Sequence, residues 1–265
     1  MFYNAKNLTL KLDNTKMDYV SFGKGKKNLV IIPGLNLRGV KGSALPLAYM
    51  YRIFAKEYKV YVFDRKDDIY KGYTVEEIAE DICSAMNMLG IKNADVFGVS
   101  QGGMIAQYLA INHPELVNRL VLAVTLSKQN ETVTMVIENW VEMSESKDYD
   151  ALVIDMMEKL YSENYLKKYK WLIPIAAKFS KPKDFRRFII LAKACLTCDT
   201  YNKLNLIKCP VLVLGGKQDK IVTGKASEEI AEKLNCNIFR YEDLGHAAYE
   251  EAKDFNSRIK AFLDN

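Results

Sequence analysis

The stretch of sequence that decides the fold is ADVFGVSQGGMIA, residues 94–106. A short apolar run leads into Ser100, and glycines stand two residues before and two residues after this serine. A helical pattern begins at once and continues to about Asn112. Small flanking residues allow a sharp, strained turn that raises the hydroxyl at the positive end of the helix. The pattern predicts a nucleophilic serine, and an ordinary glycine-rich turn is the alternative.

The rest of the chain alternates short strands with helices. Residues 8–12 and 17–22 alternate between apolar and polar positions, whereas 29–32 are apolar throughout, as in a central strand covered on both faces. Besides the pair around Ser100, strands are predicted at 60–63, 120–124, 210–214 and 237–241, and helices at 45–56, 74–89, 224–234 and 254–263. This alternation indicates βαβ units, so we expect an α/β fold with a mostly parallel central sheet flanked by helices.

The middle of the chain breaks this rhythm. Residues 127–208 show no clear strand pattern, only helical patterns rich in Met, Tyr, Lys and Glu, for example at 152–160 and 185–194. The strand pattern then resumes at 210–214. We therefore expect residues 1–126 and 209–265 to form one core domain, into which 127–208 is inserted as a helical segment.

Composition limits the class of protein. The 265 residues are 49% hydrophobic and 27% charged, which is typical of a globular chain that buries a sizeable core. The first six residues lack the apolar core of a signal peptide, and no stretch approaches the roughly eighteen apolar residues of a membrane helix. We expect a cytoplasmic protein without an integral membrane segment. The net charge of +5 comes with no nucleic-acid-binding motif, so no nucleic-acid partner is predicted.

The five cysteines are an odd number, which does not fit a secreted disulfide framework. Cys195 and Cys198 have the spacing of a redox pair, but they stand inside a helical pattern, with no second pair or nearby histidine to complete a zinc site. We interpret them as two thiols on part of a helix face, and a redox or metal role is the alternative.

Positive charge concentrates in residues 167–187, where eight basic side chains oppose one acidic side chain, Asp184. Aromatic residues stand among them. The basic residues are Lys167, Lys168, Lys170, Lys178, Lys181, Lys183, Arg186 and Arg187. We interpret the segment as the solvated face of an amphipathic helix pair, and contact with an anionic substrate or lipid surface is the alternative.

A nucleophilic serine needs an imidazole to accept its proton and a carboxylate to orient that imidazole. The chain has two histidines. His246 lies in a loop after the last predicted strand, whereas His113 ends the helix that begins at Ser100. At about 1.5 Å per residue, that helix separates His113 from the serine by roughly 20 Å. We predict that His246 is the base and that His113 caps the helix or lies on the surface.

The carboxylate is also expected after a strand, because loops at the carboxyl ends of parallel strands converge on one edge of the sheet. Asp219 follows the apolar strand at 210–214 and is the predicted acid. Asp64 ends the strand at 60–63 and is the alternative, although it precedes the serine in the chain and needs a different arrangement.

Negative charge that develops on a substrate oxygen needs hydrogen-bond donors, each usually worth about 3 kcal/mol. Two backbone N–H groups are candidates for this oxyanion hole. One belongs to Gln101, directly after the predicted nucleophile, and the other belongs to Leu35, in the glycine-containing turn after the strand at 29–32. This chemistry needs no metal and no cofactor, and none is predicted.

These features resemble the α/β-hydrolase superfamily over nearly the whole chain. The resemblance rests on IPGL at 32–35, GVSQGG at 98–103, HPE at 113–115, the strand at 209–216 with Asp219, and Gly-His at 245–246. It implies Ser100 as nucleophile, Asp219 as acid and His246 as base, in the chain order of that superfamily, with 127–208 as a cap over the active site. The serine turn is similar to those of small carboxylesterases, lactonases and cofactor-free haloperoxidase-like members.

Two positions depart from the superfamily pattern. Pro33 stands where the family usually has a histidine before Gly34, which keeps the backbone donor but removes a supporting side chain. After Asp64 the family often has a glycine-rich turn, whereas this chain has RKDDIY at 65–70. Because of the second departure, the resemblance does not predict the shape of one wall of the pocket.

Together these observations predict a metal-free serine hydrolase that cleaves a carboxylic ester or related acyl bond. A ligand-binding protein with slow turnover, and a cofactor-free lyase or acyl transferase that uses the same residues, are the alternatives. Apolar residues of 127–208 favour a small hydrophobic substrate, although such residues are also typical of a helical core. These are Met135, Trp140, Met143, Met156, Met157, Tyr161 and Trp171.

Overall fold

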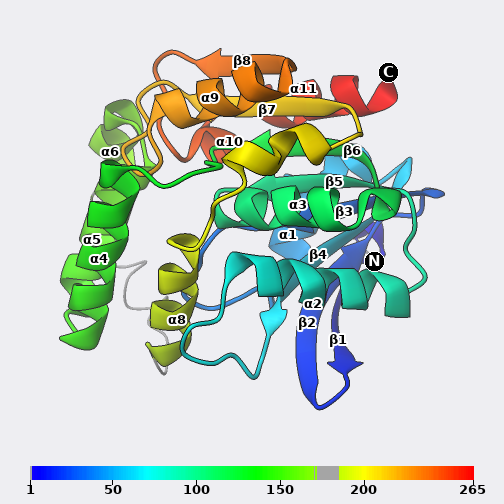
Figure 1. The fold of residues 1–265 in the computed structure, drawn as a ribbon, viewed down its shortest axis with the longest axis horizontal. Helices are drawn as coiled ribbons and strands as arrows, with labels where there is room; N and C mark the ends of the chain where they lie inside the picture. The colour runs from blue at the N-terminus through cyan, green and yellow to red at the C-terminus, as the bar shows by residue number, and fades with distance from the viewer. Residues whose placement is uncertain (1, 170, 172–184) are drawn as a thin grey trace.

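The computed structural model describes residues 2–169, 171 and 185–265 of the chain. The strands of this part are β1 (Lys6–Leu12), β2 (Thr15–Phe22), β3 (Lys27–Ile32), β4 (Tyr58–Lys66), β5 (Ala94–Val99), β6 (Val117–Ala123), β7 (Val211–Gly216) and β8 (Asn237–Tyr241). They form one sheet in the order β1-β2-β4-β3-β5-β6-β7-β8 (Figure 1). The pairs β1/β2 and β2/β4 are antiparallel and the others are parallel. The predicted α/β fold with a mostly parallel sheet is confirmed.

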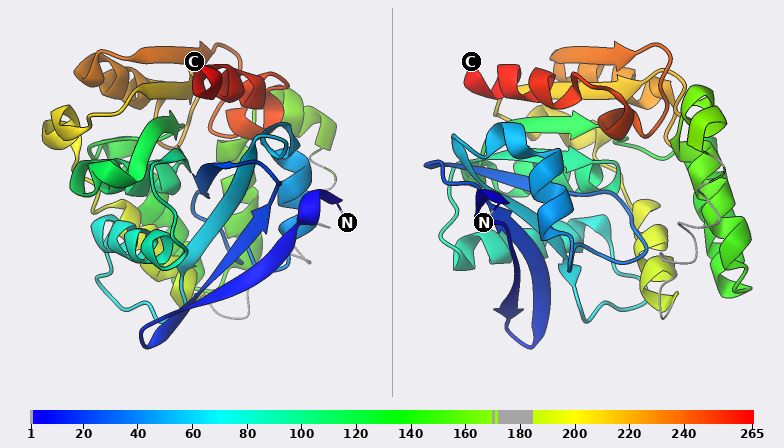
Figure 2. Two further views of the ribbon diagram at one scale, coloured as in Figure 1. Left: turned by 90° about the vertical axis from the view of Figure 1, so that its right-hand side faces the viewer. Right: turned by 180° about the vertical axis from the view of Figure 1, so that it is seen from behind.

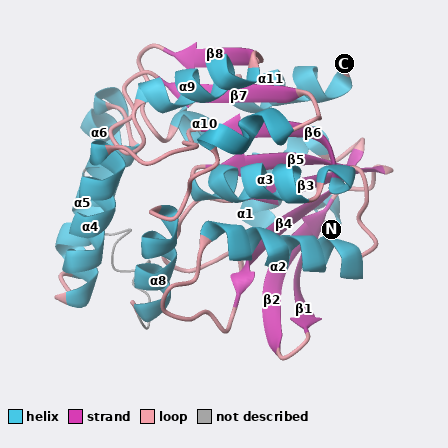
Figure 3. Ribbon diagram, viewed as in Figure 1, coloured by secondary structure: helices cyan, strands magenta, loops and turns pink. Residues whose placement is uncertain are grey.

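Helices cover both faces of the sheet (Figures 2 and 3). One face carries α2 (Val75–Met88), α3 (Gln101–Asn112) and α9 (Gly224–Leu234), and the other carries α1 (Ala44–Met50) and α11 (Phe255–Asp264). A large cluster of buried apolar side chains lies on each side of the sheet. Because the central strands are covered on both faces, every residue of β5 is buried, which explains the short apolar run before Ser100.

Between β6 and β7 the chain forms α4 (Glu131–Glu145), α5 (Tyr149–Leu160), α6 (Glu163–Tyr169) and α8 (Arg186–Cys195). These helices lie beyond the carboxyl ends of the parallel strands (Figure 1), and α4 packs against α5 and α8. The end of the predicted insertion, the 3-10 helix η5 (Tyr201–Leu206), packs instead on α3 and α9. Within the described ranges, no helix combines the length and the apolarity that crossing a bilayer requires.

Two predicted helices are shorter than their sequence patterns. The helix expected at 45–56 ends at Met50 and is followed by a separate 3-10 turn, η2 (Arg52–Phe54). The helix expected to hold both Cys195 and Cys198 ends at Cys195. There the Thr197 hydroxyl donates to the Ala194 carbonyl oxygen at 2.8 Å, a local bond that competes with continued helix.

Candidate active site

Ser100 occupies the turn between β5 and α3, in a backbone conformation that residues other than glycine rarely adopt. Its φ is 53° and its ψ is −119°, a type of strain that costs about 1–3 kcal/mol. Close approach requires the flanking glycines: a Cβ on Gly98 would lie 2.4 Å from the Gly102 carbonyl oxygen, and one on Gly102 would lie 1.9 Å from that of Ile32. The turn is therefore strained and tightly packed, as the sequence pattern predicts.

Hydrogen bonds join Ser100, His246 and Asp219. His246 Nε2 lies 2.9 Å from Ser100 Oγ, and His246 Nδ1 lies 2.7 Å from Asp219 Oδ2. The three residues follow β5, β8 and β7, so they meet where the carboxyl ends of parallel strands converge. The carboxylate favours a proton on Nδ1, which leaves Nε2 to accept a hydrogen bond from the serine hydroxyl.

Backbone amides orient the Asp219 carboxylate. Its Oδ1 accepts from the N–H groups of Ile221 at 2.8 Å and Val222 at 3.0 Å. The side chain is 1% exposed, and a buried carboxylate is costly unless it is hydrogen-bonded in this way. With one oxygen held by the backbone, the other faces His246.

The loop that carries His246 is anchored to the helical segment between β6 and β7. The N–H of Ala247 donates to the carbonyl oxygen of Leu160, the last residue of α5, at 2.7 Å. The position of the imidazole is therefore tied to that of α5.

Asp64, the alternative acid, is held elsewhere. Its Oδ2 accepts from the Val40 N–H at 3.0 Å, and its Oδ1 accepts from the Arg65 N–H at 2.7 Å and lies 3.4 Å from an Arg187 nitrogen. The structure thus brings Asp219, not Asp64, to the imidazole. The segment 65–70, whose contribution to the pocket was open, supplies none of the described residues that line the cavity beside Ser100.

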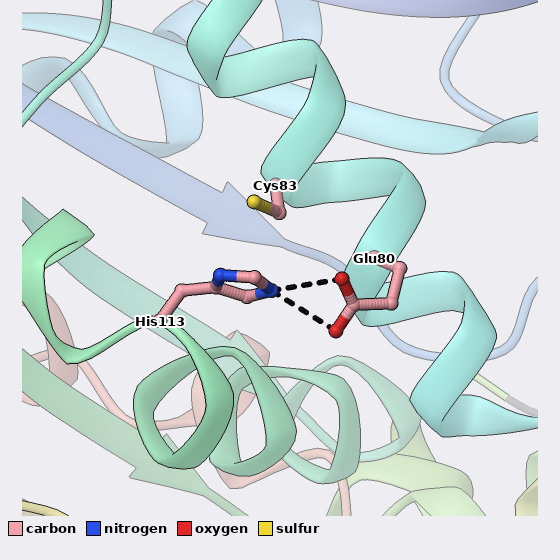
Figure 4. Close-up of side chains that lie close together, drawn as sticks. All are labelled: Glu80, Cys83 and His113. Carbon is pink, nitrogen blue, oxygen red and sulfur yellow. Dashed lines mark hydrogen bonds and ion pairs between the residues drawn. The ribbon is translucent and has the colours of Figure 1, made fainter.

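The second histidine, His113, is the C-cap residue of α3 and is partly exposed, in line with its predicted place. Its Nε2 lies 2.8 and 3.0 Å from the two carboxylate oxygens of Glu80 on α2 (Figure 4). Cys83 stands one turn along α2, and one potential ligand atom of each of these three residues lies within 4.8 Å of the other two. Since both Glu80 oxygens already face Nε2, the contact is accounted for as a pair that joins α2 to the end of α3.

The residues that carry the two predicted oxyanion donors lie next to Ser100. Gln101 is the first residue of α3, and an N–H at this position has no acceptor within its own helix. A Cβ on Gly34 would lie 3.2 Å from Ser100 Cβ, so the turn that leads to Leu35 approaches the serine closely. Leu35 lines the same cavity as Ser100 and His246. This arrangement can present two N–H groups to one substrate oxygen.

An apolar cavity of about 70 Å³ opens beside Ser100 and His246. Its apolar walls come mainly from α4, α5 and the loop after Asp219, and include Val133, Ile137, Trp140, Met156, Leu160, Ile221 and Val222. Among the described residues, no Lys, Arg, Asp or Glu lines it. Ile221, Val222 and Tyr249 also line the cavity, and they were not predicted from the sequence. Their position within three residues of the predicted acid or base was the available signal.

The predicted substrate-contacting residues of the insertion divide into groups. Trp140 and Met156 line the cavity. Met135 and Trp171 are each 69% exposed, so they lie outside it. Met143 and Met157 pack against buried apolar clusters, as expected of an ordinary helical core. The remaining residue, Tyr161, directs its hydroxyl to the Glu250 carboxylate.

All five cysteines are free. Burial raises the pKa of the Cys195 thiol to about 12, and it does the same for Cys198. Both thiols are therefore protonated at neutral pH and are poor nucleophiles. Cys195 lines the cavity, whereas Cys198 follows the end of α8 and is fully buried.

Only part of the basic segment 167–187 can be placed. Lys167 and Lys168 lie in the last turn of α6. Arg187 donates to the carbonyl oxygens of Arg65 and Lys66, so one basic side chain of the segment binds the end of β4. Lys170, Lys178, Lys181, Lys183 and Asp184 lie outside the described residues. The interpretation of this segment as a solvated face stays a prediction.

The sheet, with a serine at the strained turn after β5, defines an α/β-hydrolase fold. The chain matches the family model described as alpha/beta hydrolase fold over residues 32–154. It is 20% identical over 264 residues to 3-oxoadipate enol-lactonase 2 from Acinetobacter baylyi, with 96% of each chain covered.

Two solved structures share this fold. One is MGS-M2, an alpha/beta hydrolase enzyme from a deep-sea metagenome library, with a TM-score of 0.86 and 22% identity over 97% of this chain and 98% of that chain. The other is the esterase EaEST from Exiguobacterium antarcticum, with a TM-score of 0.83 and 19% identity over 98% of this chain and 100% of that chain.

Proposed function

We propose that this protein is a serine hydrolase that cleaves a carboxylic ester or a related acyl bond through an acyl-enzyme on Ser100. The observation that carries the proposal is the hydrogen-bonded series from Ser100 Oγ through His246 to Asp219. A hydroxyl becomes an effective nucleophile when an oriented base accepts its proton. The names of two similar proteins, an enol-lactonase and an esterase, support the same class, because a lactone is a cyclic ester.

In the first half of the reaction, Ser100 Oγ attacks the substrate carbonyl while His246 Nε2 accepts the hydroxyl proton. Asp219 stabilises the resulting imidazolium without taking the proton itself. The backbone N–H groups of Leu35 and Gln101 donate to the oxyanion, a contribution usually worth about 3 kcal/mol for each donor. The alcohol then leaves with the proton from His246, and Ser100 is acylated.

In the second half, His246 removes a proton from a water molecule, and the oxygen of that water attacks the acyl carbon. The same two N–H groups stabilise the second oxyanion. Ser100 leaves with the proton returned by His246, and the carboxylic acid is released. The cycle uses only these side chains, two backbone donors and water.

We also propose that residues 127–208 act as a cap that selects the substrate. Helices α4 and α5 of this segment supply much of the apolar wall beside Ser100. A substrate carboxylate against this wall would lose its hydration without gaining a partner, at a cost of several kcal/mol. The cavity measures about 70 Å³, whereas a single water needs about 10–15 Å³ by the same measure. The proposed substrate therefore carries a short, uncharged, apolar group at this position.

The test combines a fluorophosphonate probe with p-nitrophenyl esters of graded acyl length. The expected result is covalent labelling of Ser100, fastest turnover of short acyl chains, and loss of both in Ser100→Ala. Product analysis with a competing alcohol separates hydrolysis from acyl transfer, because a transferase gives the new ester. Wild-type turnover by Ser100→Ala would refute the proposal, and a labelled serine that turns over no ester would favour a binding protein.

A further inference from the structure

Arg65 is a buried cation that bridges the two chain segments of the proposed oxyanion hole. It lies near the end of β4 and is 2% exposed. Its Nη2 donates to the Pro33 carbonyl oxygen at 2.8 Å and to Gln101 Oε1 at 2.8 Å. Pro33 precedes Gly34 and Leu35 in one segment, and Gln101 opens α3 in the other. A single nitrogen therefore fixes both segments relative to each other.

Burial of this guanidinium lowers the stability of the folded protein. Desolvation lowers the pKa of Arg65, and its Nε and Nη1 have no hydrogen-bond partner within the described part of the chain. Unpaired N–H groups on a buried cation oppose folding, because they lose their hydration without gaining an acceptor. The local fold therefore keeps Arg65 buried at a cost, and its two good hydrogen bonds are both to the segments beside Ser100.

The side chain of Gln101 extends the bridge to the helical segment over the site. While its Oε1 accepts from Arg65, its Nε2 donates to the Leu191 carbonyl oxygen and to Cys195 Sγ, both in α8. Gln101 is fully buried, so these bonds are shielded from water and are stronger for it. The Gln101 side chain, which sequence analysis did not consider, thus fixes the residue whose backbone N–H is a proposed donor.

We propose that Arg65 is a positioning residue that sets the separation and direction of the Leu35 and Gln101 N–H groups. This inference rests on the proposed function. Pro33 has no side-chain donor with which to hold its own turn, so the support comes from Arg65 on the neighbouring strand. Backbone N–H donors stabilise the transition state only when they point at the oxygen on which negative charge develops. Losing the hydrogen bonds of Arg65 should therefore weaken transition-state stabilisation more than substrate binding.

The experiment compares Arg65→Met, which keeps the length but not the donors, with Arg65→Lys, which keeps the charge. We expect Arg65→Met to lower kcat by about 10- to 100-fold, less than the loss of a donor itself, with KM changed less than about threefold. Inhibition by a boronic acid, which forms a tetrahedral adduct on serine, should weaken in parallel with kcat. Arg65→Lys should recover part of the loss, since one ammonium can donate to both oxygens.

Arg187→Met is the matched control. Arg187 also binds the end of β4, through the carbonyl oxygens of Arg65 and Lys66, but it contacts neither Pro33 nor Gln101. Its kcat should remain within about twofold of wild type. Gln101→Leu, which keeps the backbone N–H, should lower kcat in the same way as Arg65→Met. The double variant should be no worse than the more affected single variant, because both remove one bridge.

Several results would overturn the inference. A folded Arg65→Met protein with wild-type kcat and boronic acid affinity refutes it, as does a change in KM alone. Should Arg65→Met fail to fold, Arg65→Lys and Gln101→Leu decide, and wild-type kcat in both refutes the inference. Failure of the proposed function is distinct, because it appears as full activity in Ser100→Ala.

Discussion

Both histidines of this protein face a carboxylate at almost the same distance, yet their surroundings differ. His246 Nδ1 lies 2.7 Å from Asp219 with side chains 3% and 1% exposed, whereas His113 Nε2 lies 2.8 Å from Glu80 with side chains 23% and 50% exposed. The other nitrogen of His246 faces the Ser100 hydroxyl, and that of His113 faces Glu115 at 3.9 Å. A histidine–carboxylate pair is therefore no mark of catalysis by itself. Burial, and a hydroxyl on the opposite nitrogen, distinguish the pair that we propose to be catalytic.

The largest expected effect comes from removing the buried imidazole. His246→Ala should lower kcat for p-nitrophenyl butyrate by about 10⁴- to 10⁶-fold, because Ser100 loses the base that accepts its proton. Steady-state kinetics measure the loss, and circular dichroism checks that the fold is retained. A decrease of less than about tenfold would show that another group activates Ser100.

The acid of the buried pair gives the next largest effect. Asp219→Asn should lower kcat by about 10³- to 10⁴-fold, because an amide neither stabilises the imidazolium nor enforces the tautomer with the proton on Nδ1. Asp64→Asn is the matched control, since Asp64 contacts Arg187 and backbone N–H groups. Its kinetics should change far less. Equal losses in the two variants would contradict the assignment of Asp219.

The apolar wall next to the buried pair should control chain length. Met156→Ala enlarges the cavity and should shift the ratio of kcat/KM for octanoyl and butyryl esters by about tenfold toward the longer chain, the lower end of the effect expected for one methylene. The same substitution at Met135, which is 69% exposed on α4, should leave this ratio unchanged. An unchanged ratio in Met156→Ala would remove this wall from the substrate site.

Removing the histidine of the exposed pair should have the smallest effect on activity. His113→Ala should leave kcat unchanged and lower the free energy of unfolding by at most about 1 kcal/mol, the value typical of surface pairs. Urea denaturation measures the change, and about 1 M salt should shrink it by screening the pair. A large loss of activity would break the contrast between the two histidines.

Much of this arrangement could be predicted from the sequence because its signals are local. The alternation of strands and helices indicated the parallel sheet, and the strained turn at Ser100 had glycines at the two positions where a Cβ would clash. Asp219 and His246 could be chosen because each follows a strand, and the carboxyl ends of parallel strands meet. Periodicity and turn chemistry thus predicted residues that lie together although they are far apart in the chain.

The remaining features depend on contacts between distant segments. The guanidinium of Arg65 reaches Gln101 across 36 positions, and Gln101 reaches Leu191 across 90. Neither contact has a local pattern, because any strand-end arginine or buried glutamine looks the same in sequence. The residues of the cavity wall could not be predicted for the same reason. Trp140 lines the cavity, whereas the equally large Trp171 is exposed. Which face of a helix turns inward is decided by tertiary packing.

Leu160 contributes to the site through two separate chemical groups. Its side chain lines the cavity, while its carbonyl oxygen accepts the hydrogen bond from Ala247 beside His246. Any amino acid brings the same carbonyl, so the side chain at this position can be exchanged without removing the anchor of the His246 loop. In the function we propose, selection on substrate preference therefore acts at this position separately from selection on the reaction itself. Descendants of this chain then acquire new substrates here while they retain the proposed catalytic geometry.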